Sequence, residues 1–142
     1  MKKNIYAYIW ETPQDFFEKI NQEFNFTLDV CANKDNAKCK NYFSPIDNGL
    51  IKDWGNNICW MNPPYSIEIS QWVKKALLES KKRATVVCLL PVRSDTRWWW
   101  NYCMQGEIRF IKGRLKFKGR NKDGKSVNYP ATFPSALVIF KS

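Results

Sequence analysis

The apolar residues of this chain are grouped in two ways, as continuous runs and as stripes at helical spacing. Residues 58–61 form a continuous apolar run followed by Asn62 and two prolines, and residues 84–91 form a second run that ends at Pro91. These runs predict two strands buried on both faces of a sheet. Between them, apolar residues recur three and four positions apart over residues 67–81, which predicts an amphipathic helix that covers the sheet. A strand, a helix and a strand in this order predict a right-handed βαβ unit with parallel strands.

The remaining segments add a helix before this unit and strands on both sides of it. Thr12 as N-cap, Pro13 and Asp15 form a helix-start pattern, and the apolar stripe behind them predicts a helix over residues 13–24. The other predicted elements are strands at residues 26–32, 107–117 and 134–140, a short strand at 42–43, a short helix that opens at 94–95 and a loop over 118–130. This order predicts an α/β fold. In the short helix, residues 98–100 are all tryptophan, so at least one is expected to be exposed or in contact with a ligand.

The length and composition bound the class of protein. A chain of 142 residues is long enough for one domain with a real core and short for two. No apolar stretch reaches the roughly 18 residues of a membrane span, and the basic start lacks the apolar core of a signal peptide. We therefore expect a cytoplasmic protein with no membrane partner. Five cysteines form no C-x-x-C pair, which predicts buried free thiols.

The charge balance indicates the class of partner. Lysine and arginine number 23 against 13 aspartate and glutamate, which gives a formal net charge of +10 and favours a polyanion such as nucleic acid. A generally basic, soluble surface is the alternative. The chain has no histidine, which excludes Ser-His triads, Cys-His dyads and zinc sites built on histidine.

The most informative stretch is Asn62-Pro63-Pro64-Tyr65, directly after the first buried strand. Neither proline has an N–H, so the chain leaves the sheet in a stiff, extended form, at the strand end where open α/β sheets bind ligands. The Asn62 side-chain oxygen and a proline carbonyl are acceptors suited to the two hydrogens of an amino group on a planar ring. Tyr65 offers a ring face for stacking. A proline-terminated strand with a packing tyrosine is the alternative.

Cations cluster toward the C-terminal part of the chain. The candidate residues for binding the phosphates of a nucleic acid are Arg114, Lys116, Lys118, Arg120, Lys122 and Lys125. The first three alternate with Leu115 and Phe117, so we expect the cations on one face of a strand and the apolar pair on the other. The clustering favours a ribbon that contacts phosphates, and a solvated hairpin is the alternative.

Candidate cofactor contacts lie at an early strand and in the loop behind it. Asp29 stands near the end of the strand predicted over residues 26–32, where Rossmann-like sheets meet a cofactor that carries adenosine. The glycine-rich G-x-G-x-x-G loop is absent, and Cys31-Ala32-Asn33 stands in its place. Asp47, at a turn signal, is a second candidate. A capped turn is the alternative at both aspartates.

Taken together, these residues resemble the motifs of one known family. The matching segments are Trp10-x-Thr12-Pro13, Leu28-Asp29-Val30-x-Ala32, Asp47-x-Gly49-Leu50, Trp54, Asn62-Pro63-Pro64-Tyr65, Leu90-Pro91, Gly113-Arg114-x-x-Phe117 and Pro134-Ser135-Ala136-Leu137. In this order they are similar to the small phage-type DNA N6-adenine methyltransferases, the Dam-like family. The resemblance implies S-adenosyl-L-methionine as methyl donor and adenine N6 in double-stranded DNA as acceptor. It also implies a compact Rossmann-like class I methyltransferase sheet, mostly parallel with an antiparallel C-terminal strand.

The resemblance also implies the site residues, position by position. Asn62, Pro63, Pro64 and Tyr65 would form the catalytic site, holding and polarising a flipped-out adenine for direct in-line methyl transfer, with no metal. The cofactor pocket would be lined by Trp10, Thr12, Pro13, Asp29, Ala32 and Asp47. Residues 1–142 would form a single methyltransferase domain without a separate target-recognition domain. Base readout would then come from the basic 112–125 segment or from a second subunit of a homodimer, and a phage-encoded member would act in the host cytoplasm.

Two other functions fit the same residues. The acceptors of the Asn-Pro-Pro-Tyr stretch would serve any planar amino group, so an amino-methyltransferase acting on RNA or on a protein glutamine stays open. A non-catalytic nucleic-acid-binding module would use the cations as an electrostatic track and the tryptophans at 98–100 as a stacking platform. A methyl-transfer assay that compares DNA, RNA and protein acceptors would distinguish a DNA methyltransferase from the first alternative. A binding measurement with the methyl donor would distinguish it from the second alternative.

Overall fold

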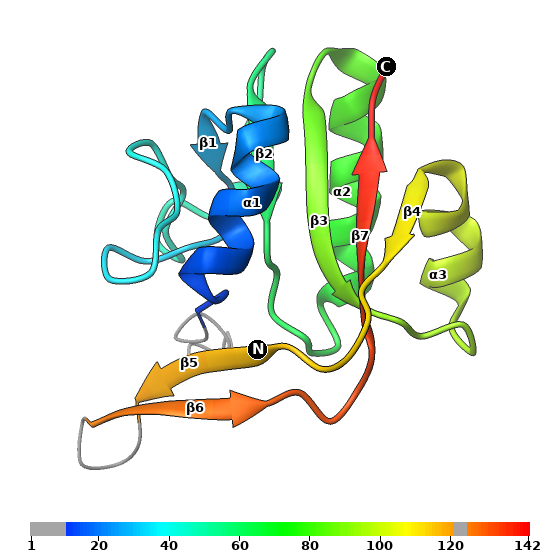
Figure 1. Ribbon diagram of the computed structural model, residues 1–142. Helices are drawn as coiled ribbons and strands as arrows, with labels where there is room; N and C mark the ends of the chain where they lie inside the picture. Colours follow the sequence, from blue (N-terminus) through cyan, green and yellow to red (C-terminus); the bar gives the residue numbers. More distant parts are fainter. Residues whose placement is uncertain (1–10, 121–124) are drawn as a thin grey trace.

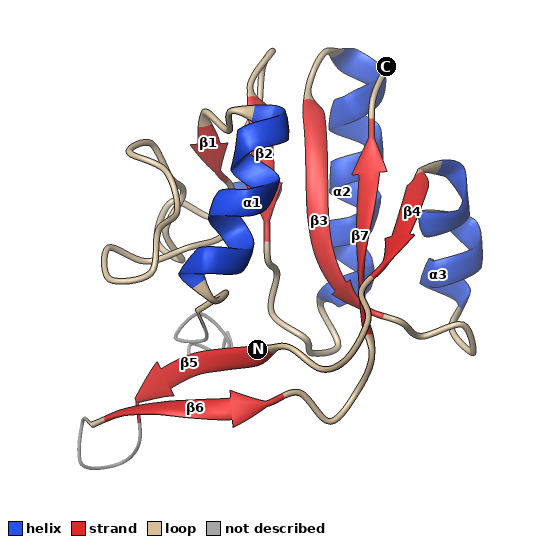
Figure 2. Ribbon diagram, viewed as in Figure 1, coloured by secondary structure: helices blue, strands red, loops and turns tan. Residues whose placement is uncertain are grey.

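The computed structural model describes residues 11–120 and 125–142 as an α/β fold. Its elements are α1 (Gln14–Phe24), β1 (Leu28–Asp29), the 3-10 turn η2 (Gly49–Ile51), β2 (Ile58–Met61), α2 (Ile69–Lys82), β3 (Thr85–Pro91), α3 (Arg97–Asn101), the 3-10 turn η3 (Cys103–Gln105), β4 (Glu107–Phe110), β5 (Lys116–Arg120), β6 (Ser126–Pro130) and β7 (Ser135–Phe140). Figures 1 and 2 show a central sheet with helices on both faces and a separate two-stranded hairpin at one end.

The central sheet has five strands in the order β1-β2-β3-β7-β4. β2 is parallel to both β1 and β3, whereas β7 is antiparallel to both of its neighbours, β3 and β4. These pairings confirm the predicted sheet, which is mostly parallel with an antiparallel C-terminal strand. α2 connects β2 to β3, as predicted for the βαβ unit.

Alternate residues of the central strands pack on opposite faces of the sheet and divide the core into two clusters. Cys59 and Met61 of β2 join the cluster that contains α2, whereas Trp60 between them packs with Phe17 and Phe24 of α1. Because helices cover both faces, the central strands carry continuous apolar runs rather than alternating ones. The carboxyl ends of the parallel strands meet at one edge of the sheet, and this edge holds the candidate site.

The single strand predicted over residues 107–117 is wrong, because the chain leaves the central sheet after Phe110. The Ile111 N–H still donates to the Ser135 carbonyl, and Gly113 then adopts a φ of 81°, which glycine does without steric cost. β5 begins after this turn and belongs to a different sheet. The loop predicted over 118–130 is also wrong, since β5 and β6 pair across it as an antiparallel hairpin.

The strand predicted over residues 26–32 is much shorter than expected. β1 covers two residues, because the chain beyond it turns toward the segment around Tyr42. There the Asp29 N–H donates to the Asn41 carbonyl, and the Phe43 N–H donates to the Asp29 carbonyl. The short strand predicted at 42–43 is accordingly an isolated bridge between Asp29 and Tyr42.

The short helix α3 begins later than the predicted start at 94–95. The Thr96 hydroxyl caps it by accepting the Trp99 N–H, which fixes the first helical residue at Arg97. Trp98 and Trp99 are buried in the core, and Trp100 is 60% exposed. This confirms that the three tryptophans do not all face one side.

The cysteines test the prediction that the thiols are free and buried. All five cysteines are free, and four are buried, which confirms the predicted buried thiols. Burial raises the pKa of Cys103 to about 12, so this thiol stays protonated and unreactive.

In the ranges that the structure describes, every helix is too short or too polar to cross a membrane.

Candidate functional site

The candidate site lies where β1 and β2 end at the carboxyl edge of the sheet. β2 leads directly into Asn62, Pro63 and Pro64, and both prolines are buried. β1 ends at Asp29, one strand away in the same direction. Because the two strands are parallel and adjacent, the Asn62 and Asp29 side chains belong to the same edge, as expected for a ligand site in an open α/β sheet.

The Asn62 carboxamide is held by the side chain of Thr12. Asn62 Nδ2 donates to Thr12 Oγ1 at 3.1 Å, and Thr12 is 1% exposed. Within the described part of the chain, Asn62 Oδ1 accepts no hydrogen bond. The amide is therefore fixed at its nitrogen end, while its oxygen retains the capacity to accept.

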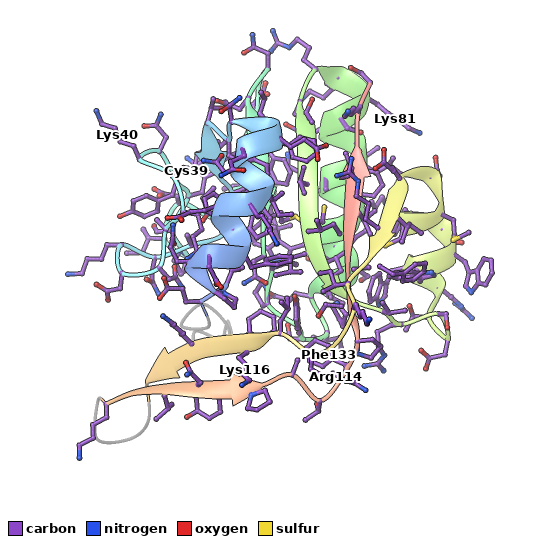
Figure 3. The ribbon with its side chains drawn as sticks, in the orientation of Figure 1. Cys39, Lys40, Lys81, Arg114, Lys116 and Phe133 are labelled. Atoms are coloured by element: carbon purple, nitrogen blue, oxygen red, sulfur yellow. The ribbon has the colours of Figure 1, made fainter. Side chains whose placement is uncertain are left out.

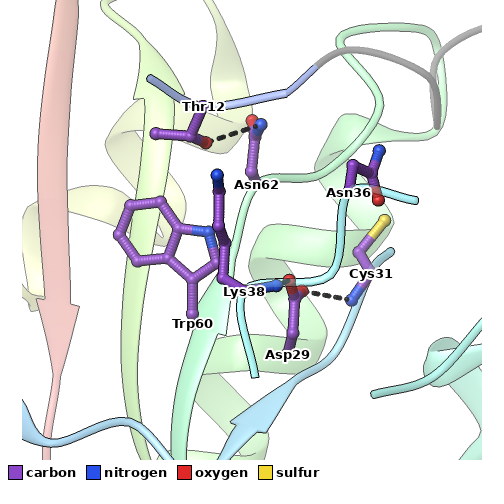
Figure 4. Close-up of a pocket in the computed structure, with 7 residues that line it drawn as sticks. All are labelled: Thr12, Asp29, Cys31, Asn36, Lys38, Trp60 and Asn62. Atoms are coloured by element: carbon purple, nitrogen blue, oxygen red, sulfur yellow. Dashed lines mark hydrogen bonds between the residues drawn. The ribbon is translucent and has the colours of Figure 1, made fainter. Parts of the chain in front are cut away.

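A polar hollow opens beside this amide (Figure 4). Its lining residues are Thr12, Asp29, Cys31, Asn36, Lys38, Trp60 and Asn62, and about 190 Å³ of empty space, open solvent included, lies among them. The Lys38 side chain extends past the Trp60 ring toward Thr12 and Asn62 (Figure 4). The hollow thus joins the two strand ends and the segment that precedes α1.

Asp29 organises the loop on one side of the hollow. It is 2% exposed, Oδ1 accepts the Cys31 N–H at 3.2 Å and Oδ2 accepts the Lys38 N–H at 3.0 Å. Burial raises the pKa of Asp29 to about 7, although the two backbone donors act in the opposite direction. The carboxyl group is therefore poised to titrate near neutral pH.

Lys38 connects this loop to α1 across the hollow. Its side chain is 3% exposed, and Nζ donates to Glu11 Oε1 at 3.0 Å and to Gln14 Oε1 at 2.8 Å. Nζ also lies 5.9 Å from the centre of the Phe17 ring. Sequence reasoning missed Lys38, because it lies in a polar stretch without any period.

Tyr65 is anchored beside the site rather than projecting freely. Its hydroxyl donates to the Leu89 carbonyl of β3 at 2.9 Å, and burial raises the pKa of Tyr65 far above its usual value. The ring meets Phe117 and Phe133 edge-on, at centroid distances of 6.1 and 5.4 Å. Its orientation is therefore fixed by a hydrogen bond at one end and by aromatic contacts around the ring. The two phenylalanines were not predicted as site residues.

The hairpin is attached to the same site through β5. Glu11 and Lys118 exchange two backbone hydrogen bonds of 2.7 and 2.9 Å, which places β5 next to the residue preceding Thr12. Phe117 is buried, whereas Lys116 and Lys118 are exposed, confirming that cations and apolar residues occupy opposite faces. Figure 3 shows Lys116 on the hairpin, with Arg114 nearby. Arg114 and Lys125 are also exposed.

The other predicted site residues occupy varied positions. Pro13 caps α1 through its backbone, and Ala32 is buried next to Cys31. Asp47 is exposed and is not among the residues that line the hollow. Its Oδ2 accepts the backbone N–H and the hydroxyl of Ser44, and these bonds lower its pKa. Trp10, Lys122 and the side chain of Arg120 lie outside the described part of the chain.

The fold and the site together define an α/β protein with a ligand hollow at the carboxyl edge of its sheet and a cationic hairpin beside it. A family profile described as DNA N-6-adenine-methyltransferase (Dam) matches residues 2–142. The DNA N-6-adenine-methyltransferase of Haemophilus phage HP1 (strain HP1c1) is 37% identical over 139 residues, which cover 94% of this chain and 78% of the phage protein. A protein of the same name from Escherichia phage T1 is 32% identical over 92 residues, which cover 63% of this chain and 38% of that protein. The chain therefore belongs to the DNA N-6-adenine-methyltransferase (Dam) family, which confirms the resemblance in its motifs.

Proposed function

We propose that this protein methylates N6 of adenine in double-stranded DNA, with S-adenosyl-L-methionine as the methyl donor. The observation that carries the proposal is the Asn62 carboxamide at the end of β2, bound at its nitrogen by Thr12. Its oxygen can accept a hydrogen bond from an exocyclic amino group. The family and the names of the phage relatives support adenine in DNA as the acceptor. We further propose that the sheet is a Rossmann-like methyltransferase sheet.

The polar groups of the hollow fit this methyl donor by their chemistry. Each oxygen of Asp29 accepts one backbone N–H and keeps a lone pair for a ligand hydroxyl. The Lys38 ammonium complements a carboxylate. Lys38 Nζ already donates to Glu11 and Gln14 across the hollow, where the cofactor would have to enter. We therefore expect the Lys38 side chain, which runs along the hollow, to move when the cofactor enters.

The chemistry of transfer places few demands on the protein beyond orientation. When bound, the cofactor would supply a methyl group on a positively charged sulfur. The N6 lone pair of adenine would form the new bond to carbon as the carbon–sulfur bond breaks with its electrons left on sulfur, and N6 would lose one proton to water. Asn62 Oδ1 and the Pro63 carbonyl accept hydrogen bonds from the amino group, which localises its lone pair and directs it. Pro63 and Pro64 keep these acceptors rigid because they fix the backbone and offer no competing donor.

The hairpin supplies the surface for duplex DNA. Its exposed cations lie on the strand that pairs with Glu11, so a phosphate backbone bound there passes close to Thr12 and Asn62. Extrusion of the target base costs a few kcal/mol, and stacking against an aromatic ring such as Tyr65 offsets about 1–3 kcal/mol of that cost. We propose that the chain acts as a single catalytic domain in which this hairpin, with or without a second subunit, contributes to base readout.

A methyl-transfer assay with several acceptors tests the proposal. The protein is incubated with S-adenosyl-L-methionine carrying a deuterated methyl group and with duplex DNA, RNA of the same sequence or a glutamine-containing protein, and the digested products are analysed by mass spectrometry. We expect labelled N6-methyladenine from duplex DNA alone. A duplex of G·C pairs is the control acceptor. Label in RNA or in glutamine would show that RNA or protein, rather than DNA, is the substrate. DNA binding without any labelled product would identify a non-catalytic module.

A further inference from the structure

Thr12 has the sequence context of a helix cap but does not act as one. Thr12, Pro13 and Asp15 form a helix-start pattern, yet α1 has no side-chain cap bond and Pro13 occupies its N-cap position. The Thr12 hydroxyl instead accepts Asn62 Nδ2, 50 positions further along the chain, at 3.1 Å. The predicted capping role is therefore wrong, and the hydroxyl is used at the site.

The backbone fixes Thr12 from both sides. Before it, Glu11 is paired with Lys118 of β5 by two hydrogen bonds. After it, the chain enters α1 through Pro13, whose ring restricts the backbone. The Thr12 side chain is 1% exposed. The oxygen of this hydroxyl accepts the Nδ2 hydrogen bond, so Thr12 holds the Asn62 carboxamide at its nitrogen end.

The proposed chemistry requires that the Asn62 carboxamide be held with its oxygen toward the adenine amino group. Its donor end and its acceptor end have a similar shape, and the torsion that exchanges them has broad, roughly two-fold preferences. Only the oxygen can accept a hydrogen bond from an amino group. With its ends exchanged, the amide would direct its own hydrogens at those of the adenine amino group.

We infer that Thr12 is a positioning residue for the proposed methyl transfer: its hydroxyl holds Asn62 Nδ2, so that Oδ1 meets the adenine amino group. The inference rests on the proposed function. It gives Thr12 a role different from the cofactor contact that the family resemblance implies, because Thr12 acts through Asn62.

A second threonine–asparagine pair in the chain provides a matched control. Thr27 Oγ1 donates to Asn57 Oδ1 at 2.9 Å and accepts the Ile58 N–H at 2.9 Å. This pair lies at the amino end of β2, the opposite end of the strand from Asn62. Thr27→Val also removes a threonine–asparagine side-chain hydrogen bond, here with threonine as the donor, and leaves the carboxyl edge untouched.

The test compares Thr12→Val, Thr12→Ser and Thr27→Val with the wild-type protein. Valine removes the hydroxyl with little change in shape, and serine keeps it. We expect Thr12→Val to lower kcat for DNA methylation roughly 10- to 100-fold, as misplacement of a reacting group does, while the Kd values for the methyl donor and for duplex DNA stay near wild type. Thr12→Ser should restore most of kcat, and Thr27→Val should leave it unchanged.

A second readout does not depend on activity. The side-chain amide signals of Asn62, assigned by their loss in Asn62→Ala, should shift or broaden in the nitrogen-15 NMR spectrum of Thr12→Val. The same signals should be preserved in Thr12→Ser and Thr27→Val. Unchanged Asn62 signals in Thr12→Val would overturn the inference.

Two kinetic outcomes would also overturn it. Equal kcat values for Thr12→Val and Thr12→Ser would show that the hydroxyl does not matter. A Kd for the methyl donor that weakens in step with kcat would make Thr12 a cofactor ligand instead. If the wild-type protein methylates no acceptor, the proposed function itself is rejected. If the wild-type protein is active but Thr12→Val leaves its activity unchanged, only the inference about Thr12 is rejected.

Discussion

The exposed cations of the hairpin give the prediction with the best-defined magnitude. Arg114, Lys116 and Lys118 are exposed, and none of them is in an ion pair with another described residue. Replacing all three by glutamine should remove three phosphate contacts. Each contact contributes about 0.9 to the slope of log K against log salt concentration, so the slope should become shallower by about 2.7. Between 50 and 200 mM salt, the wild-type protein should therefore lose roughly 40-fold more affinity than the variant.

Fluorescence anisotropy of a labelled duplex over a salt series measures this slope directly. The matched control replaces Lys74, Lys81 and Arg83, which are also exposed and make the same change in charge on α2 and just beyond it. Figure 3 shows Lys81 at the opposite end of the molecule from Arg114 and Lys116. We expect the control variant to keep the wild-type slope. Equal slopes for the two variants would refute the hairpin as the DNA surface and would leave only a general effect of net charge.

Two further predictions concern single side chains at the site. Because burial raises the pKa of Asp29 to about 7, a carbon-13 NMR titration of its carboxyl should have a midpoint near neutral pH, and a midpoint near the ordinary 3.8 would contradict the buried environment. Since this pKa is higher in the folded than in the unfolded chain, the free energy of unfolding should lose up to about 1.4 kcal/mol per pH unit from this group as the pH rises from about 4 to about 7. Tyr65→Phe removes the hydrogen bond to the Leu89 carbonyl and should lower the free energy of unfolding by about 0.5–1.5 kcal/mol, measured by urea denaturation, while methyl transfer continues. A variant with unchanged stability would show that this bond does not anchor the ring.

The βαβ unit could be predicted because its signals are local. The apolar run that forms β2 stops at Asn62 before two prolines, and the run that forms β3 ends at Pro91. The stripe between them has the helical period, so α2 starts and ends within about two residues of its prediction. The same local signals placed Asn62 at a strand end. Asp29 was named as a candidate by its position near a strand end and Thr12 through the family resemblance, and the structure brings both to the hollow beside Asn62.

The features that could not be predicted depend on contacts between distant segments. The alternation around Phe117 is the same in a hairpin as in a longer strand, so only the turn at Gly113 and the pairing of Glu11 with Lys118 reveal the second sheet. Lys38 has no sequence signal because its role arises from its reach to Glu11 and Gln14. The cap pattern at Thr12 was a true local signal that a tertiary contact overrode.

The most direct measurement is methyl transfer by Asn62→Ala compared with Asn101→Ala, which makes the same chemical change on an exposed residue of α3. Both variants are assayed on duplex DNA, and the Kd for S-adenosyl-L-methionine is measured by calorimetry. We expect Asn62→Ala to lose methyl transfer while its Kd stays close to wild type, and Asn101→Ala to keep both. Wild-type kcat in Asn62→Ala would contradict the role assigned to the carboxamide at the end of β2.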